Sequence, residues 1–63
     1  MIEEIKSEDD TLTVFAVKGL VSLTITEYYP ALQQSYSASI DLREKQAEQL
    51  LKTLQMWSEE YGQ

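Results

Sequence analysis

The sequence predicts an α+β fold, a three-stranded antiparallel meander followed by one C-terminal amphipathic helix packed on one face of the sheet. In three runs between residues 11 and 40, apolar residues recur at every second position, on one face, and from residue 43 they recur with the 3.6-residue period of a helix. A length of 63 residues allows one small domain. We therefore expect a single domain over 1–63, with an acidic segment at 1–10, the sheet at 11–42 and the helix at 43–61.

A β-hairpin is predicted around Lys18-Gly19, which separates two β-rich runs in TLTVFAVKGLVSLTIT. Gly19 can adopt the positive φ that such a turn needs. If Val17 pairs with Leu20, one face of the hairpin becomes wholly apolar, and a one-residue slip would mix the faces. The apolar pairs are Ala16–Val21, Val14–Leu23 and Leu12–Ile25, and the pairs on the other face are Phe15–Ser22, Thr13–Thr24 and Thr11–Thr26.

A third strand is predicted in SYSASI, where apolar residues alternate with serines. Pro30 ends the preceding run because it cannot donate a hydrogen bond to a neighbouring strand. The link after Pro30 is short, so this strand should run antiparallel to the second. Tyr36 is expected on the core side of the sheet and Tyr28 on the open Ser/Thr side, where Phe15 also lies.

A helix is predicted from Arg43 because apolar residues fall on one stripe from Ala47 to Tyr61. Asp41 and Glu44 have the spacing of a capping box, and Gly62 is placed to end the helix. Packing this stripe on the sheet gives the predicted core: Leu12, Val14, Ala16, Val21, Leu23, Ile25, Tyr36, Ala38, Ile40, Leu50, Leu51, Leu54 and Trp57.

Negative charge is concentrated at the start of the chain. The segment MIEEIKSEDD holds five of the 11 acidic residues and one cation, within a net charge of −6. Its local structure stays open between a helical turn, an extra edge strand and a loose arm, because Ile2 and Ile5 alone do not decide the period. Such a charge disfavours direct contact with nucleic acid or anionic membrane and favours a basic partner. Solubility alone is the competing interpretation of the same charge.

Composition argues against catalysis and against a bound cofactor or zinc ion, and leaves open only a calcium or magnesium site built from carboxylates alone. The chain contains no His and no Cys, which removes the commonest general acid-base, the thiol nucleophile and the usual zinc ligands. Gly19 and Gly62 are the only glycines, so no Gly-rich phosphate loop can form. We therefore expect a non-catalytic protein. The chain has no apolar run of membrane-spanning length and no signal-peptide pattern at its start, so we expect it in the cytoplasm.

An acidic surface that meets a basic protein is the function that the charge favours. Duplex DNA carries one charge per ~1.7 Å, so full DNA mimicry along the predicted helix would need about sixteen charges on one side. The 11 acids are spread around the chain, so only a local acidic contact is expected. The predicted partner-binding residues are Glu3, Glu4, Glu8, Asp9, Asp10 and Tyr28.

In size, charge and layout the chain resembles small acidic proteins of phages and other mobile elements, of the anti-CRISPR kind. The resemblance covers the whole chain in size and style and involves no specific motif. Separately, the strand-to-helix stretch SASIDLREKQAEQLLKTL resembles a common ending of small domains. It implies an inhibitor that blocks a basic, nucleic-acid-binding surface of a host protein or nucleoprotein complex such as a CRISPR effector. That inhibitor would work in the host cytoplasm.

A second hypothesis is a small dimeric accessory or antitoxin-like regulator that associates through the open Ser/Thr face of the sheet. The free energy gained by burying the predicted core is close to the free-energy cost of the conformational entropy lost on folding. A monomer of this length should therefore have marginal stability. Monomer and homodimer therefore both stay open, and Phe15 is the predicted contact residue of the dimer.

Overall fold

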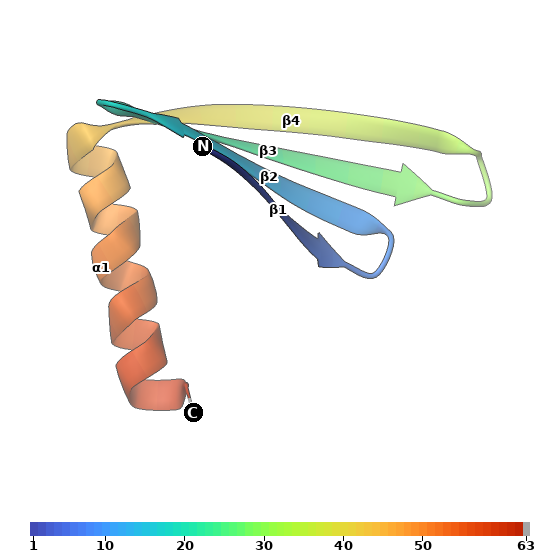
Figure 1. Ribbon diagram of the computed structural model, residues 1–63. Coiled ribbons are helices and arrows are strands. Elements are labelled where there is room, and N and C mark those ends of the chain that lie inside the picture. Colours follow the sequence, from blue (N-terminus) through green and yellow to red (C-terminus); the bar gives the residue numbers. More distant parts are fainter. Residues whose placement is uncertain (63) are drawn as a thin grey trace.

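The computed structural model describes residues 1–62 of the chain and contains an antiparallel sheet followed by one helix (Figure 1). The sheet has four strands in the order β1-β2-β3-β4, so each strand pairs with its neighbours in sequence. The α+β class, the meander and the C-terminal helix agree with the sequence prediction, but the predicted strand number of three is wrong. The elements are β1 (Ile2–Ser7), β2 (Asp10–Val17), β3 (Leu20–Tyr29), β4 (Gln34–Arg43) and α1 (Glu44–Tyr61).

The central hairpin has the predicted register. Val17 pairs with Leu20 across the Lys18-Gly19 turn, and the six further predicted pairs between β2 and β3 are all present. Gly19 adopts a φ of 82°, a conformation that L residues rarely adopt. Side-chain alternation and the turn therefore determine this part of the fold together.

The additional strand is β1, formed by part of the acidic segment 1–10. It pairs antiparallel with β2, so that Ile5 lies opposite Leu12 and Glu3 opposite Val14. A two-residue turn, Glu8-Asp9, joins the two strands, and Glu8 adopts a φ of 57°. The segment is thus an edge strand and a turn, the second of the three conformations that the sequence left open.

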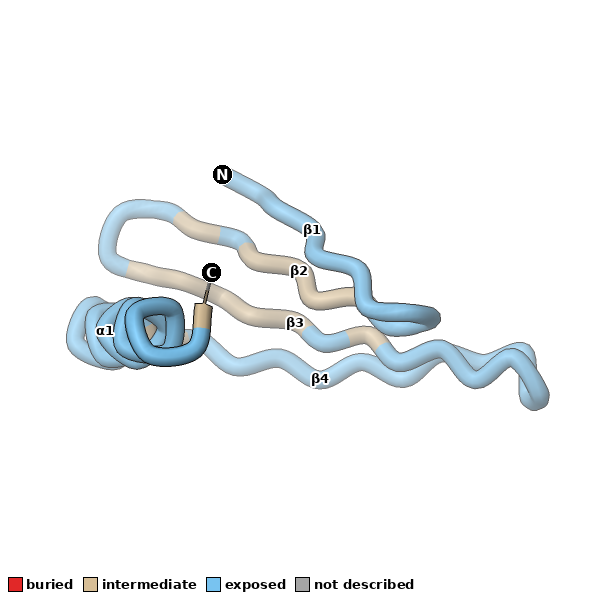
Figure 2. The backbone as a smooth tube through the Cα atoms, turned by 90° about the horizontal axis from the view of Figure 1, so that it is seen from below, coloured by how far each residue is buried: buried red, intermediate tan, exposed pale blue. Residues whose placement is uncertain are grey.

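The helix follows β4 directly, because β4 ends at Arg43 and α1 begins at Glu44. It projects away from the sheet instead of lying across it, and is viewed nearly end-on in Figure 2. Arg43 is the N-cap without a side-chain capping bond, and Asp41 pairs with Ser22 inside the sheet, so the predicted capping box is wrong. The helix ends at Tyr61, where the N–H of Gly62 donates a 3.0 Å hydrogen bond to the Ser58 carbonyl.

Packing of the helix on the sheet is the prediction that the structure contradicts most clearly. No residue within the described range 1–62 is fully buried (Figure 2). Of the thirteen predicted core residues, six are half-buried: Leu12, Val14, Ala16, Val21, Leu23 and Leu50. The other seven are exposed: Ile25, Tyr36, Ala38, Ile40, Leu51, Leu54 and Trp57. The physical reason is the missing loop between β4 and α1, which prevents the helix from folding back onto the sheet.

Candidate interaction surfaces

One face of the sheet, which we call the inner face, has an apolar centre. Strand pairing places in this centre Leu12, Val14, Ala16, Val21, Leu23, Ile25, Ala38, Ile40 and Leu42. The same face carries Glu3, Ser7, Asp10, Glu27 and Gln34 toward its margins. Ile25 lies on β3, between Leu12 of β2 and Ala38 of β4, and yet 53% of its surface is exposed. Ile40 is 58% exposed. Side chains in the middle of a sheet are normally covered by a second layer, so this face lacks its covering layer within one chain.

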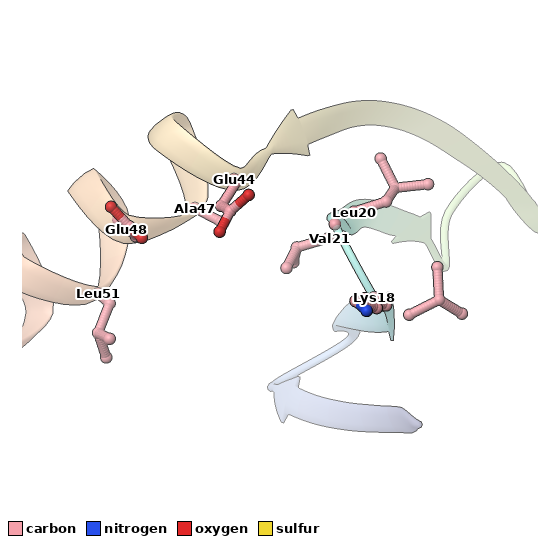
Figure 3. Close-up of a pocket in the computed structure, with 9 residues that line it drawn as sticks. Lys18, Leu20, Val21, Glu44, Ala47, Glu48 and Leu51 are labelled. Atoms are coloured by element: carbon pink, nitrogen blue, oxygen red, sulfur yellow. The ribbon is translucent and has the colours of Figure 1, made fainter.

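Most of the apolar stripe of α1 is also uncovered, and only Ala47 and Leu50 of it are half-buried. We define the helix stripe as Ala47, Leu50, Leu51, Leu54, Trp57 and Tyr61. Its first turns face the Lys18-Gly19 hairpin turn across an open pocket of about 490 Å³, where Val21, at the end of the inner face, points toward Glu44 and Ala47 (Figure 3). Further along the helix, Leu54 and Trp57 are 54% and 59% exposed. The stripe therefore starts at the inner face and then leaves it.

The accessible surface of the chain is too large for a closed monomer. A folded monomer of 7.3 kDa should expose about 4,200 Å², whereas this chain exposes 5632 Å². Its radius of gyration is 13.9 Å, compared with about 11 Å for a compact domain of 63 residues. Both quantities describe an open shape in which sheet and helix share little contact.

The opposite face of the sheet, the outer face, is rich in serine and threonine. Thr24 Oγ1 lies 2.8 Å from Ser39 Oγ, and Thr26 Oγ1 lies 3.0 Å from Ser37 Oγ, so cross-strand hydroxyl pairs connect β3 and β4. Phe15 is 40% exposed among these groups. A hydroxyl-lined face with its own hydrogen bonds is well suited to water.

Four of the six predicted partner-binding residues lie together at the end of the sheet farthest from the helix. Glu8 and Asp9 form the β1–β2 turn, and Asp10 Oδ1 accepts a 3.4 Å hydrogen bond from the backbone N–H of Tyr28. Glu27 of β3 joins this group. Thr26 pairs with Thr11 in antiparallel register, so the next residue of β3, Glu27, lies level with the preceding residue of β2, Asp10. We call Glu8, Asp9, Asp10, Glu27 and Tyr28 the acidic end.

The other two predicted residues lie apart from the acidic end. Glu3 pairs with Val14 and lies on the inner face, whereas Glu4 pairs with Thr13 and lies on the outer face. Adjacent residues in a strand point to opposite sides, so these two carboxylates cannot contact one flat partner surface together. Sequence reasoning grouped them with the acidic end because they are close in the chain.

Electrostatics at the acidic end affect Tyr29. The negative charge of Glu27 raises the pKa of Tyr29, with smaller contributions from desolvation, from the side-chain hydrogen bond to Glu27 and from the charge of Asp10. The Tyr29 hydroxyl donates that bond to Glu27 Oε2 at 3.4 Å. Tyr29 also packs edge-on against Tyr36, with ring centroids 5.5 Å apart. Tyr36, predicted in the core, instead forms an exposed aromatic pair on the inner side of this end.

The described residues contain no group of three or more acidic, His or Cys side chains arranged to hold a metal ion. Over the same residues, α1 is the single helix, and it lacks the length of apolar sequence needed to cross a bilayer. Comparisons of the chain with protein-family models, with curated proteins and with solved structures gave no match.

Proposed function

We propose that this protein is a non-catalytic inhibitor or regulator whose acidic end binds a basic surface of another protein. The observation that supports the proposal is the gathering of four carboxylates from two separate segments at one end of the sheet. Glu27 and Tyr28 are adjacent in β3 and point to opposite faces, so a partner that contacts both has to reach around this end. Tyr28 is 40% exposed and offers a rigid aromatic surface with a polar tip. Glu8 and Asp9 lie in a turn that reaches solvent, so a partner can approach them freely.

The size of the acidic end suits a local contact with arginine and lysine side chains. Four charges within one sheet end match a small basic patch, whereas duplex DNA presents a charge every ~1.7 Å along its length. The net charge of −6 adds long-range attraction that accelerates encounter with a basic partner. A basic patch that normally binds nucleic acid would then be blocked, in the manner of anti-CRISPR proteins acting in the host cytoplasm.

The experiment compares two double charge reversals with the same change in net charge. Glu8→Lys with Asp9→Lys alters the acidic end, and Glu59→Lys with Glu60→Lys alters the far end of α1. Each immobilised protein is used to capture partners from host lysate, which are eluted over a salt series and identified. We expect the wild type and the helix variant to retain a basic protein that elutes with salt, and the turn variant to lose it.

Equal loss from both variants would show that net charge alone attracts the partner, and the proposal would fail. Retention of the same partner by the turn variant would also refute it. Asp10 is left unchanged in both proteins because its carboxylate accepts the Tyr28 backbone hydrogen bond. Loss of binding therefore cannot be assigned to a broken contact within the sheet.

A further inference from the structure

We infer that the inner face and the helix stripe form the contact surface between two copies of this chain. In this arrangement the helix stripe of each copy packs on the inner face of the other. The inference goes beyond the proposed function, because it concerns a different surface of the molecule and a different partner. It also differs from association through the outer face, the arrangement that the sequence suggested.

The area available for association fits a dimer. The chain exposes about 1,500 Å² more than a compact monomer of its mass. Covering this excess in both copies buries about 3,000 Å² in total, within the range of about 2,000–5,000 Å² found for obligate homodimers. The structure therefore exposes as much extra surface as a stable dimer needs to bury.

The two uncovered surfaces also match in chemistry. The helix stripe runs about 21 Å from Ala47 to Tyr61, and the apolar centre of the inner face runs about 13 Å along β3 from Val21 to Ile25 and extends across three strands. An amphipathic helix and a one-sided sheet each require an apolar partner, and helix-on-sheet packing is the usual way to supply it. Between residues 1 and 62 the direct β4–α1 connection leaves the two surfaces apart, and a second copy can supply the complement of each.

Charges lie around the inner face and not in its centre. Glu3 lies on the edge strand β1, while Asp10 and Glu27 lie at the acidic end. The nine residues at the centre of the inner face are uncharged, and so are the six residues of the helix stripe. An apolar centre with a charged rim is the usual anatomy of a protein interface, and it keeps like charges of the two copies apart.

A second copy satisfies both surfaces at once. In a two-fold dimer the same patch is used on both subunits, so each helix stripe finds an inner face and each inner face finds a helix stripe. A different protein would have to carry an apolar groove for the helix and an apolar cover for the sheet. The chain itself carries both complements.

Sedimentation equilibrium of the full chain tests the inference directly. We expect wild type at about 100 μM to sediment as a species of twice the 7.3 kDa chain mass. Leu54→Asp, in the middle of the helix stripe, should weaken association at least 100-fold. Gln55→Asp places the same charge one residue away, off the stripe, and should leave association within about threefold of wild type.

A single-chain mass for the wild type would overturn the inference, and this measurement does not depend on whether any variant folds. A mass other than two chains would overturn the pairing as well. Phe15→Asp on the outer face provides the last control. If Phe15→Asp dissociates the protein while Leu54→Asp does not, the copies meet through the outer face and the inference is wrong.

Discussion

Truncation of Ile25 distinguishes an open inner face from a covered one by its effect on stability. Ile→Ala removes three carbons, which contribute about 0.8 kcal/mol each when fully buried. Ile25 is 53% exposed within one chain, so its truncation in a monomer should cost only about 1 kcal/mol. In the dimer the side chain is covered, and the loss should rise to about 2–5 kcal/mol per chain because a cavity forms.

Ile2 offers a matched control for the same chemical change. It pairs with Phe15 on the outer face and is 65% exposed, so Ile2→Ala should cost about 1 kcal/mol or less in either state. Urea unfolding followed by the fluorescence of Trp57, the single tryptophan, measures both losses in the same buffer. Ile25→Val removes one carbon and supplies a milder variant if Ile25→Ala does not fold.

Equal losses for Ile25→Ala and Ile2→Ala would refute the reasoning, since they would show that the inner face stays in water. For a chain of 63 residues, 1 kcal/mol corresponds to a Tm shift of about 8 °C. The two outcomes therefore differ by at least that shift in a thermal scan. They can be separated with ordinary circular dichroism.

Three further predictions concern concentration, the turns and pH. If the protein unfolds cooperatively from a dimer, its Tm, measured by calorimetry, should rise by about 5 °C for each tenfold increase in chain concentration. The Tm of a monomer should not change with concentration. Gly19 has a φ of 82°, which disfavours residues with a side chain, so Gly19→Ala should destabilise the protein by about 1–2 kcal/mol. Glu8 has a φ of 57°, so Glu8→Gly should relieve the same penalty and stabilise the protein by up to a similar amount; urea unfolding measures both changes. The pKa of Tyr29 is raised in the folded protein, so the fold favours the protonated hydroxyl. This contribution to the free energy of unfolding should be fully present below pH 10 and should be lost as the pH rises through the folded-state pKa. Glu27→Gln should lower that pKa toward its usual value in a spectrophotometric titration, and an unchanged titration would contradict the assignment to Glu27.

The part of the fold that sequence predicts well is set by local patterns. The β2–β3 register follows from alternation around Lys18-Gly19, and the helix differs from its predicted range by one residue at the start. β1 could not be assigned because its hairpin turn, Glu8-Asp9, contains no glycine to indicate the positive φ that Glu8 adopts. The local sequence of Ile2–Ser7 does not alternate clearly enough to specify a strand.

Burial could not be predicted because an apolar pattern specifies a face and not what covers it. Leu54 and Trp57 belong to an amphipathic stripe, as predicted, but no local signal shows that the chain passes from Arg43 to Glu44 without a loop. The acidic end shows the same limit. Glu27 is 17 positions from Asp10 in sequence, and only the strand register places the two side by side.

A chain without a buried residue in its described range has consequences for its lifetime in a cell. Proteases cleave chains that open, and a monomer with so little internal packing opens readily. In the proposed dimer each copy protects the other, so survival would rise with the amount already made. Slow synthesis would then yield little protein, whereas a burst of synthesis would yield a persistent pool. Through that dimer, the open corner between β4 and α1 would make accumulation depend on dose, with a threshold that a self-contained domain would lack.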